Sequence, residues 1–509
     1  MHRSLALLAA VASAALIVSF AILRNGWAST DDAPSLPRAD TEVTIWSRTA
    51  SAPISPGFVG VSVEYPALTA YAGSDSRRLD PAFEQLLRNL APGQSPVLRI
   101  GGDSSDTTWW PVAGVHRPAG VTYSLSPRWL AVVRRLATDT GARLILGIDL
   151  EAGQPGLARA EGRALLRGLG GRVLRALEIG NEPTRYVLFP WYHTRSGHAV
   201  FARRRGYGFG SFATEFTHVA SLLPASVPLA GPTLTGFGWM RNLGAFLGAQ
   251  RHIGVVTFHR YPLNRCFTTV RSPQYPTVAN LLDARSSRGL GQSLAAYVSI
   301  AHRHGLPFRL DEINSVACGG KAGVSNTLAS SLWALDTLFA TARAGVSGVN
   351  VHTFPGAAYA LFSFRRAGGR WLTSVRPEYY GLLMFAWAAP PGSRIVAVRQ
   401  RGGSAVRSWG TRGADGTIRV TLINDDPARP HVVLVRLPSG ARRPATLIRL
   451  RGPGLDATAG VTLGGRSFAP TSGGRLGQVR SSAVASPAPG EYLVSVPAAS
   501  AALLRIPQG

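Results

Sequence analysis

The chain has 509 residues, of which 45% are hydrophobic and 16% charged, and its formal net charge is +27. These values exclude a mostly disordered protein, and the length predicts either one large α/β barrel with an added module or several smaller domains. The arginines are spread along the whole chain without a dense basic run, so the composition does not favour a nucleic-acid-binding protein. A surface of solvated charge accounts for the basic balance, and such a surface would also attract an anionic substrate or polysaccharide.

The chain opens with a pattern typical of export. A basic start precedes an uncharged run over residues 5–23 and a small-x-small cleavage site at 26–28. The run is long enough to span a bilayer, so residues 1–28 are interpreted either as a cleaved signal peptide or as a membrane anchor. Residues 29–40 have the composition of a polar linker. We therefore expect a secreted protein, or one anchored at the extracellular side of a membrane.

Short apolar segments then alternate with helical patterns. The apolar segments are 58–65, 96–102, 143–150, 176–182, 227–232, 253–261, 308–314 and 349–354. Helical patterns such as 81–90, 127–140 and 328–344 lie between them. Eight βα repeats over roughly 300 residues predict a TIM barrel, because right-handed parallel crossovers leave few other topologies. We assign residues 54–385 to this barrel.

After the barrel, short β-type segments are separated by Gly, Pro, Asp and Ser. This pattern predicts an antiparallel β-sandwich over residues 386–509. The segment EVTIW at 42–46 comes too early to be a barrel strand, so residues 41–53 are expected to contribute a strand to the sandwich. The predicted fold class is α/β, a (β/α)8 TIM barrel with a C-terminal β-sandwich that takes in an N-terminal strand.

Two glutamates lie at the ends of predicted barrel strands. Glu182 ends the fourth strand in LEIGNEPTRY, and Glu312 ends the seventh in RLDEINS. Because polar residues at C-terminal strand ends converge on the active site of a TIM barrel, these carboxyl groups would face each other across one cleft. Such a pair suits glycoside hydrolysis, in which one carboxyl group protonates the leaving oxygen and the other attacks the anomeric carbon. Asp311 precedes Glu312 in the same strand, so its side chain should point to the opposite face. We therefore expect Asp311 to make a structural contact.

The motifs around these glutamates resemble a known enzyme family. Asn181-Glu182-Pro183 on strand four, with Glu312 on strand seven, is similar to the large clan of retaining glycosidases built on this barrel. Within that clan, several segments resemble glycoside hydrolase family 79, the bacterial β-glucuronidases and heparanases. The segments are RIGGDSSD (99–106), FHRYP (258–262), EINSVACGG (312–320), 323–339, GVNVHTF (348–354) and, at the end of the sandwich, YLVSVPAASAALL.

The resemblance implies roles for individual residues. Glu182 would be the general acid/base, with a raised pKa, and Glu312 the ionised nucleophile that forms a glycosyl-enzyme intermediate. Asn181 would hold the sugar 2-hydroxyl, and Glu64 and Asp106 would contact hydroxyls of the first subsite. Taken singly, Glu64 has an alternative as an ion-pair partner, Asp106 as a helix N-cap and Asn181 as a turn former.

A uronic acid substrate needs donors that face its carboxylate. The resemblance places this carboxylate at the loop of Gly319 and Gly320, with tyrosines that here would be Tyr359 and Tyr261. Backbone N–H groups of a glycine loop can form an anion-binding concavity. Tyr359 fits an ordinary loop aromatic equally well. Lys321, the only lysine, is either a cationic partner of the substrate or a solvated side chain.

The neighbouring strand end and the two cysteines complete the predicted site. His259, at the end of strand six, is expected either to orient a carboxylate or to fill the cleft floor as a core histidine. Cys266 and Cys318 lie in loops above adjacent strands six and seven, so we predict a disulfide that fixes the glycine loop. The sequence has no HExxH motif, Cys/His cluster or nucleotide-binding glycine loop, so no metal or cofactor is expected.

The sequence thus predicts an exported retaining glycoside hydrolase that removes terminal β-glucuronic acid, or its 4-O-methyl form, from glycosides or polysaccharides. A second possibility is a retaining glycosidase for a neutral sugar such as a β-xyloside or β-galactoside, since Val316 and Ala317 stand where some family members are expected to have a tyrosine. An endo-acting heparanase-type enzyme and a carbohydrate-binding protein that has lost turnover are also compatible with the sequence. A carbohydrate is the expected partner in each case, and no nucleic acid is expected.

Overall fold

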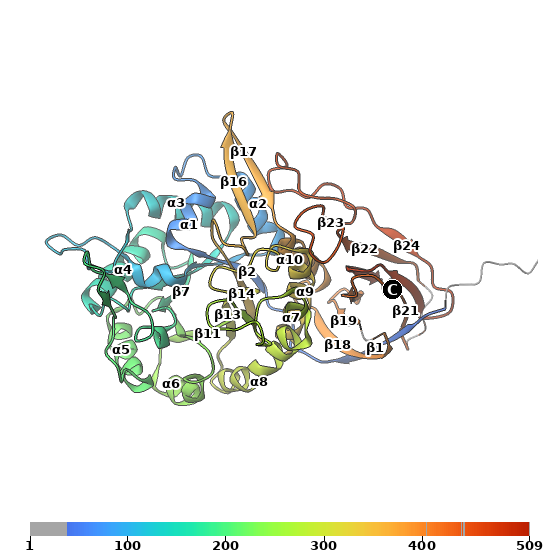
Figure 1. Ribbon diagram of the computed structural model, residues 1–509, viewed down its shortest axis with the longest axis horizontal. Helices are drawn as coiled ribbons and strands as arrows, with labels where there is room; N and C mark the ends of the chain where they lie inside the picture. Colours follow the sequence, from blue (N-terminus) through green and yellow to red (C-terminus); the bar gives the residue numbers. More distant parts are fainter. Residues whose placement is uncertain (1–37, 404, 439, 441–442, 508–509) are drawn as a thin grey trace, which may run out of the picture. The chain divides into compact units, whose positions relative to one another are not determined.

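Eight parallel strands close into a barrel (Figure 1). In chain order they are β2 (Val59–Glu64), β3 (Val97–Gly101), β6 (Arg143–Ile148), β7 (Leu174–Ile179), β10 (Leu229–Thr235), β11 (Ile253–Arg260), β13 (Phe308–Ile313) and β15 (Gly348–Thr353). Each strand pairs with the next, and β15 pairs with β2 to close the ring. Every predicted apolar segment overlaps one of these strands, so the TIM-barrel prediction is confirmed.

The computed structural model describes residues 38–403, 405–438, 440 and 443–507. The predicted signal peptide or anchor at 1–28 lies outside this part of the chain, as does most of the linker at 29–40. Among the described residues, no helix has both the length and the apolarity needed to cross a membrane.

Helices cover the outside of the barrel and connect its strands (Figure 1). They are α1 (Tyr65–Ala72), α2 (Pro81–Leu90), α3 (Pro127–Thr140), α4 (Pro155–Leu169), α5 (Phe209–Leu222), α6 (Leu243–Ala249), α7 (Val278–Leu282), α8 (Arg288–Arg303), α9 (Leu328–Arg343) and α10 (Pro377–Ala388). Two of them begin with a capping side chain followed by proline, which fixes where the helix starts. Asp80 accepts a hydrogen bond from the N–H of Ala82 at 2.9 Å, and Ser126 accepts one from the N–H of Trp129 at 3.2 Å.

A large mixed sheet follows the barrel in the chain. Its strands are β1 (Thr41–Thr49), β18 (Arg394–Gly402), β19 (Val406–Arg412), β20 (Ile418–Asn424), β21 (His431–Arg436), β22 (Ala445–Arg451), β23 (Thr462–Leu463), β24 (Ser482–Val484), β25 (Glu491–Val496) and β26 (Ser500–Ile506). Their order is β23-β22-β26-β20-β19-β18-β1-β21-β25, and β24 also pairs with β22. The N-terminal β1 lies antiparallel to β18 and parallel to β21, which confirms its predicted place in this domain.

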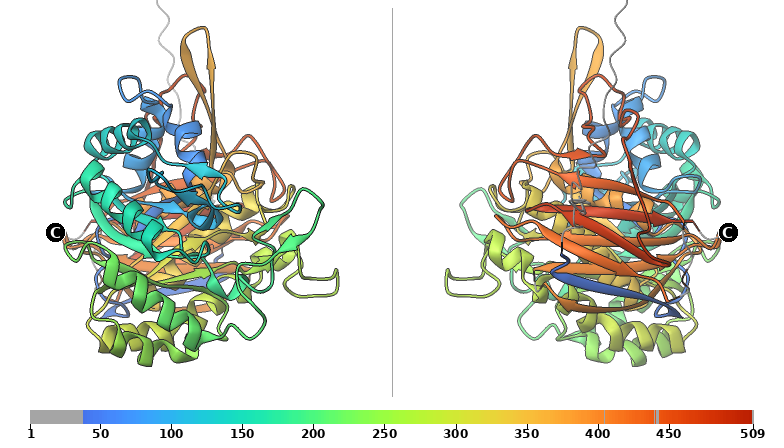
Figure 2. Two further views of the ribbon diagram at one scale, coloured as in Figure 1. Left: turned by 90° about the vertical axis from the view of Figure 1, so that its left-hand side faces the viewer. Right: turned by 90° about the vertical axis from the view of Figure 1, so that its right-hand side faces the viewer.

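The sheet curls over a core of its own (Figure 2). Strand β25 is the last strand in the hydrogen-bonded order of the sheet. It nevertheless contacts β20 and β26, which lie in the middle of that order. Side chains such as Val43, Val420, Val435 and Leu504 pack together inside the curl. The predicted sandwich is therefore one continuous sheet that folds over on itself, and its two layers share one apolar core.

Helix α9 joins the barrel to this sheet. All of its residues from Leu328 to Ala342 are buried, because α8, α10 and β18 all contact it. The Asp336 carboxylate of this helix accepts hydrogen bonds from Trp409 Nε1 at 2.7 Å and from Arg407 Nη1 at 3.2 Å. Both partners lie on β19, so a buried carboxylate links the two domains.

Short elements complete the loops around the barrel. The paired strands are β4 (Thr108–Trp109) with β5 (Tyr123–Ser124), β8 (Tyr192–His193) with β9 (Ala199–Val200), β12 (Leu263–Asn264) with β14 (Val316–Ala317), and β16 (Phe362–Ala367) with β17 (Arg370–Val375). The short 3-10 helices are η1 (Gly102–Thr107), η2 (Pro183–Arg185), η3 (Met240–Asn242) and η4 (Ala284–Ser286). The β12–β14 pair joins the loops that follow strands β11 and β13.

Candidate active site

The barrel brings Glu182 and Glu312 together. Glu182 follows β7, and Glu312 lies near the end of β13. One carboxylate oxygen of each and a ring nitrogen of His259 lie within 4.8 Å of one another. The two carboxyl groups are thus about as close as those of retaining glycosidases, which stand about 5 Å apart, and closer than the roughly 6.5 Å or more typical of inverting enzymes.

An unusual backbone conformation places Glu182 at this point. Its φ of 48° and ψ of 55° lie in the left-handed region, which side chains with a Cβ rarely adopt. The N–H of Glu182 donates a hydrogen bond to the carbonyl oxygen of Thr233 at 3.0 Å, so the neighbouring strand β10 holds the residue there. The chain therefore turns sharply after β7 and brings the carboxyl group close to His259 and Glu312.

The surroundings of Glu312 favour its ionised form. Its Oε1 accepts a hydrogen bond from the Tyr261 hydroxyl at 2.8 Å, and its Oε2 accepts one from Arg99 at 2.6 Å. Burial opposes ionisation, but the charges of His352, His259 and Arg99 and the bond from Tyr261 outweigh it and hold the pKa of Glu312 well below its usual range. A carboxylate that stays ionised has the property required of a nucleophile.

The carboxyl group of Glu182 has different neighbours. His259 Nδ1 lies 3.0 Å from its Oε1, and Arg185 donates to its Oε2 at 3.1 Å. His259 is fully buried, and its other ring nitrogen lies 3.3 Å from an Arg99 nitrogen. His259 thus contacts Glu182 directly, as the first of its two predicted interpretations requires.

Arg99 lies at the centre of the polar cluster. It comes from the middle of β3, is fully buried, and donates to Glu178 at 2.7 Å and to Asn181 Oδ1 at 3.0 Å in addition to Glu312. Arg99 was not among the residues that the sequence motifs predicted for the site. The available signal was an arginine inside an otherwise apolar strand, PVLRIGG, because a buried guanidinium requires carboxylate partners.

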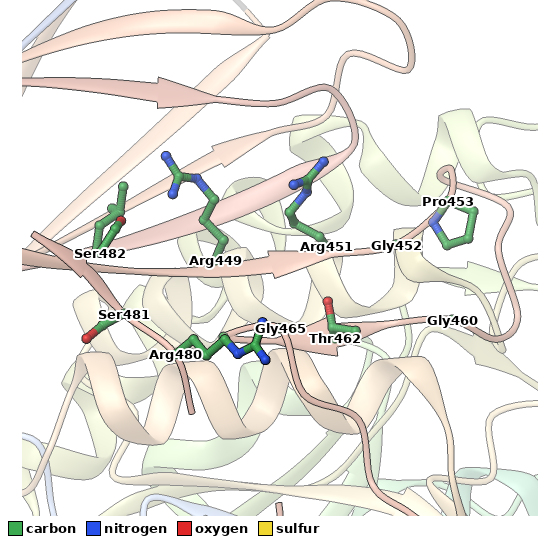
Figure 3. Close-up of a pocket in the computed structure, with 12 residues that line it drawn as sticks. Arg449, Arg451, Gly452, Pro453, Gly460, Thr462, Gly465, Arg480, Ser481 and Ser482 are labelled. Carbon is green, nitrogen blue, oxygen red and sulfur yellow. The ribbon is translucent and has the colours of Figure 1, made fainter. Parts of the chain in front are cut away.

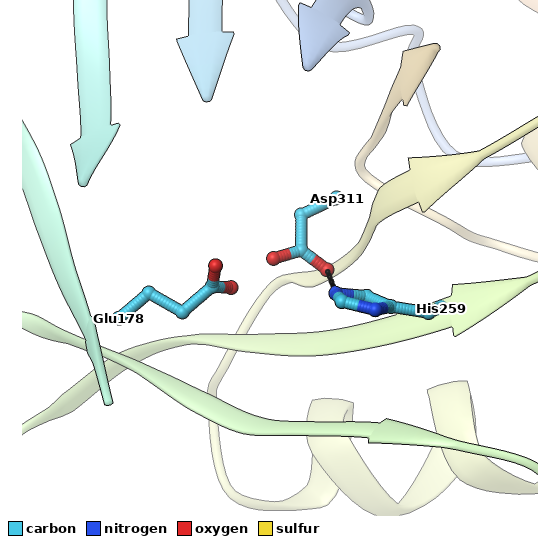
Figure 4. A group of neighbouring side chains, drawn as sticks. All are labelled: Glu178, His259 and Asp311. Atoms are coloured by element: carbon cyan, nitrogen blue, oxygen red, sulfur yellow. Dashed lines mark ion pairs between the residues drawn. The ribbon is translucent and has the colours of Figure 1, made fainter. Parts of the chain in front are cut away.

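A second layer of carboxylates lies beneath the glutamates (Figure 4). Asp311 Oδ1 is 3.6 Å from His259 Nε2, and Glu178 extends toward the same region from β7. Burial and the adjacent Glu178 raise the pKa of Asp311 well above its usual range. Asp311 Oδ2 also lies 3.8 Å from Arg99 Nε, so the structural neighbours of Asp311 include Arg99 and His259.

Adjacent residues of a regular strand point to opposite faces, yet both Asp311 and Glu312 reach the inside of the barrel. The pairing register of β13 with β15 shifts between Leu310 and Ile313, which is the signature of a bulge. This irregularity rotates the strand at its end and lets both carboxyl groups face inward.

Two sets of three side chains here have the spacing of metal ligands, namely Glu178, His259 and Asp311, and Glu182, His259 and Glu312. The guanidinium of Arg99 contacts a carboxylate of each set, at 2.7 Å from Glu178 and 2.6 Å from Glu312. A fixed cation thus already balances part of the negative charge, and the arrangement fits acid/base chemistry better than a metal centre.

Comparisons with known proteins support the resemblance noted in the motifs. Residues 408–503 match the glycosyl hydrolase family 79 C-terminal beta domain. The chain is 22% identical over 398 residues to a β-glucuronidase of Neurospora crassa, covering 69% of this chain and 67% of that one. It is also 22% identical over 366 residues to a β-glucuronidase of Aspergillus niger, covering 66% of this chain and 65% of that one.

The chain is thus similar to glycoside hydrolase family 79 in its C-terminal domain and to β-glucuronidases over about two thirds of its length. Its fold also matches a crystal structure of a 4-O-α-L-rhamnosyl-β-D-glucuronidase from Fusarium oxysporum 12S, with a TM-score of 0.70 and 19% identity over 91% of this chain and 100% of that one. A family 51 arabinofuranosidase from Xanthomonas axonopodis pv. citri shares the fold with a TM-score of 0.63, at 15% identity over 92% of this chain and 100% of that one. The barrel with its appended sheet is thus common to glycosidases of more than one family.

Asn181 and Glu64 both belong to the polar cluster around the two glutamates. Asn181 accepts from Arg99 and donates from Nδ2 to Asp103 at 3.1 Å. Glu64 accepts from the N–H of Ser104 at 2.8 Å and lies 3.3 Å from His352 Nε2. Both side chains are therefore positioned by their neighbours, and their predicted contacts with sugar hydroxyls stay predictions.

Asp106 is held by the protein itself. Its two carboxylate oxygens accept hydrogen bonds from the N–H groups of Leu150 and Asn181 and from the Tyr186 hydroxyl, at 3.0, 2.9 and 2.7 Å. These contacts fit a residue that supports the turn before Glu182. The nearby Asp103 accepts hydrogen bonds from Asn181 and Arg185, and its side chain is 72% exposed, so it is the more accessible of the two aspartates.

The glycine loop is packed against Tyr359. The N–H of Gly320 donates to the carbonyl oxygen of Val316 at 3.1 Å, and the carbonyl oxygen of Gly319 accepts from Ala358 at 2.7 Å. The Tyr359 ring is buried and its centre lies 6.3 Å from that of Tyr261. Because its N–H is already bonded, Gly320 shapes the loop and does not offer that donor to a substrate carboxylate.

The predicted disulfide between Cys266 and Cys318 is confirmed, with the two Cα atoms 6.3 Å apart. It fixes the glycine loop to the loop after β11, where exposed Arg265 donates to the carbonyl oxygen of Gly320 at 3.0 Å. Lys321 instead donates to Pro276 at 3.0 Å and lies over the ring of Tyr275. Arg265, which sequence analysis did not name, is thus the cation at the glycine loop.

His352, on β15, is another residue at the site that was not among those predicted from the motifs. Its Nδ1 lies 3.0 Å from the Ser62 hydroxyl. Burial opposes its protonation, but the carboxylates of Glu312 and Glu64 outweigh it and raise the pKa of His352. His352 Nδ1 also lies 3.9 Å from Oε2 of Glu312, so this histidine is a close neighbour of the nucleophile candidate.

Proposed function

We propose that the protein is a retaining β-glucuronidase that removes terminal β-glucuronic acid from a glycoside or polysaccharide. The observation that carries the mechanism is the separation within 4.8 Å between carboxylate oxygens of Glu182 and Glu312. The Neurospora and Aspergillus relatives are both β-glucuronidases, and this supports the choice of sugar.

In the proposed reaction, the ionised Glu312 attacks the anomeric carbon while Glu182 gives its proton to the leaving oxygen. The glycosyl-enzyme ester then reacts with a water that Glu182, now ionised, deprotonates. The Tyr261 hydroxyl and Arg99 hold Glu312 in position for the first step. His259 and Arg185 hold the other carboxyl group, so the two reacting groups are preorganised before a substrate arrives.

The substrate carboxylate would lie near the glycine loop, where Tyr261, Tyr359 and Arg265 converge. Arg265 is bound to Gly320 and can still direct further N–H donors toward an anion. A neutral sugar is the second candidate, because the N–H of Gly320 is occupied and Lys321 is bound to Tyr275 and Pro276.

The test is hydrolysis of p-nitrophenyl β-D-glucuronide, with the anomer of the first-formed sugar followed by NMR. Release of the β-anomer is expected, and release of the α-anomer would overturn double displacement. Glu312→Gln should lower kcat by about three orders of magnitude or more. Turnover of aryl β-xyloside or β-galactoside without turnover of the glucuronide would keep the mechanism and overturn the uronic acid.

The acid/base role of Glu182 has a separate test. Glu182→Ala should lose about 10²- to 10⁴-fold in activity on a substrate with a poor leaving group, but much less with a good one. Azide should restore turnover by attacking the glycosyl-enzyme, and the product should be the β-glucuronosyl azide. Failure of azide to form that product would contradict the assignment.

We also propose that the protein acts outside the cytoplasm, either secreted or anchored. The N-terminal sequence pattern and the Cys266–Cys318 disulfide support this location, because disulfides persist in oxidising compartments. Fractionation of producing cells followed by N-terminal sequencing of the protein would distinguish a cleaved signal peptide from a retained anchor.

A further inference from the structure

A basic pocket lies on the curled sheet, away from the barrel strands that carry the glutamates (Figure 3). Its volume is about 480 Å³, which is in the range of small-molecule and sugar sites. Three arginines contribute to its wall, Arg449 and Arg451 from β22 and Arg480 from the segment before β24. None of its twelve described lining residues has a carboxylate, so no acidic group within the pocket neutralises these cations.

The pocket arises because two short strands share one edge of β22. Strand β24 pairs with β22 from Ala445 to Leu447, whereas β23 pairs only with Leu450 and Arg451. Between these contacts the edge of β22 is left open to the pocket. Gly464 fills part of the gap, and its N–H donates to the carbonyl oxygen of Arg449 at 2.8 Å.

The direction of the arginines follows from strand geometry. Leu447, Arg449 and Arg451 alternate along β22 and therefore share one face of the sheet. Leu447 packs in the core inside the curl, so the two arginines extend that face toward solvent. In the view of Figure 3, Arg449 and Arg451 project to the same side of β22, and Arg480 lies on the other side of that strand.

Arg449 and Arg451 lie near enough for their charges to repel, and Arg480 lines the same pocket without a lining carboxylate. Burial and the neighbouring charge of Arg451 both lower the pKa of Arg449. Arg449 donates one hydrogen bond to the carbonyl oxygen of Ser495 at 3.2 Å, and a guanidinium has five N–H donors. Elsewhere on the sheet, arginines such as Arg407 and Arg419 pair with aspartates. Uncompensated cations at a concave site are suited to bind an oxyanion.

The lining also indicates which kind of polyanion fits. None of the described lining residues is aromatic, so the pocket has no platform on which a nucleic-acid base or the face of a neutral sugar could stack. Hydroxyl groups of Thr462, Ser481 and Ser482 stand beside the arginines and can bond to sugar hydroxyls. Charge and hydrogen bonds together fit a glycan that carries acidic groups.

We propose that this pocket, formed by Arg449, Arg451 and Arg480 with the hydroxyls of Thr462, Ser481 and Ser482, is a second carbohydrate site that binds the carboxylate or sulfate groups of an anionic polysaccharide. It lies apart from the cleft of Glu182 and Glu312, and its ligand binding does not require turnover. It would hold an acidic polymer on the enzyme while chain ends are cleaved in the barrel, a consequence that rests on the proposed function.

The test measures binding of the full chain in a Glu312→Gln background, so that no polymer is cleaved. The probes are hyaluronan, which has only carboxylates, dextran sulfate, which has only sulfates, uncharged dextran and a double-stranded DNA fragment. Replacing Arg449, Arg451 and Arg480 by Gln should weaken binding of hyaluronan, dextran sulfate or both by at least about tenfold at physiological ionic strength, because charge-assisted hydrogen bonds are lost. The probe that is affected identifies the acidic group.

The matched control replaces Arg399, Arg401 and Arg412 by Gln, three exposed arginines on β18 and β19 of the same sheet. It removes the same charge and should change binding by less than about threefold. Equal losses in both triple variants would overturn the proposal in favour of diffuse electrostatics. An equal loss for DNA and for the acidic glycans would overturn the polysaccharide assignment.

A second measurement avoids substitution altogether, in case the triple variant fails to fold. Arginines of the Glu312→Gln protein are labelled with phenylglyoxal, with and without the acidic polymer, and the modified sites are mapped by mass spectrometry. Protection of Arg449, Arg451 or Arg480, with Arg399 still labelled, is expected. Unchanged labelling of all three under saturating polymer would refute the site, whatever the result with aryl glucuronides.

Discussion

Arg99 donates a hydrogen bond of 2.6 Å to Glu312, although 213 residues separate the two in the sequence. The same guanidinium contacts Glu178, which lies in β7, and Asn181, which follows that strand. One buried cation on β3 is thus bonded both to β13 and to the end of β7. The nucleophile candidate is therefore fixed by the barrel wall and not by its own loop. This arrangement gives the site rigidity and favours the ionised carboxylate.

Tyr261→Phe tests whether the Tyr261 hydroxyl lowers the pKa of Glu312. The bond from Tyr261 lowers the pKa of Glu312, and Glu312 must be ionised to react, so activity is lost as pH falls through that pKa. Removing the Tyr261 hydroxyl raises the pKa of Glu312. The acidic limb of the plot of kcat/KM against pH should therefore move to higher pH by about one pH unit. Tyr359→Phe is the control, since among the described contacts Tyr359 makes no hydrogen bond to Glu312. An unmoved limb in Tyr261→Phe would contradict this role.

The lowered pKa of Glu312 also predicts how stability depends on pH. Its ordinary value is 4.5, and the folded value lies below it. The stabilisation is fully present above the ordinary value and is lost as pH falls through the folded value. In the Glu312→Gln variant, the free energy of unfolding should therefore fall less steeply between neutral and acidic pH than in the parent. Urea titrations at several pH values provide the measurement, and equal slopes would argue against an ionised Glu312.

Gly320→Ala and Gly319→Ala form a matched pair. Both glycines have a φ of +81°, so both substitutions strain the backbone similarly. A Cβ on Gly320 would lie 2.8 Å from the backbone nitrogen of Tyr359, whereas one on Gly319 would meet no atom within 4 Å. Gly320→Ala should therefore displace Tyr359 and raise KM for the glucuronide about tenfold more than Gly319→Ala does, equivalent to about 1.4 kcal/mol. Equal KM values would show that the Tyr359 loop does not contact the substrate.

Replacing Cys266 and Cys318 by Ser tests the loop closure. The disulfide joins residues separated by 52 positions, and its removal should lower the free energy of unfolding by about 2–4 kcal/mol. We also expect KM for the glucuronide to rise, because the glycine loop loses its connection to the loop after β11. Urea denaturation and steady-state kinetics measure the two effects. A loss of stability with unchanged KM would mean that the disulfide serves folding alone.

Asp336→Ala tests the link between the domains. Its carboxylate is fully buried and accepts from Trp409 and Arg407, so its removal leaves the Arg407 guanidinium without this partner. The expected loss is about 3 kcal/mol in the free energy of unfolding, with little change in kcat at temperatures where the variant is folded. Asp415→Ala breaks the pair of Arg419 with a carboxylate that is 57% exposed, and should cost less than about 1 kcal/mol. Similar losses in the two variants would contradict the structural importance of Asp336.

Local sequence patterns determined the architecture and the two candidate catalytic carboxyl groups. The barrel strands were predictable because each is a short apolar run between helical patterns, and Glu182 and Glu312 because they end two such runs. The N-terminal strand β1 was predictable as an apolar segment that precedes the first barrel strand. Each of these features depends on residues that are neighbours in the chain.

The tertiary structure alone decided the partners of those groups. Asp106 and Asp103 belong to one motif, yet only the packing of Tyr186 and Leu150 around Asp106 leaves Asp103 as the exposed carboxylate. The inward turn of Asp311 depends on a bulge between paired strands, and Arg99 depends on carboxylates far along the chain. Strand register and barrel closure determine which residues become the partners of buried charges. They bring together residues that are far apart in the sequence and share no local pattern.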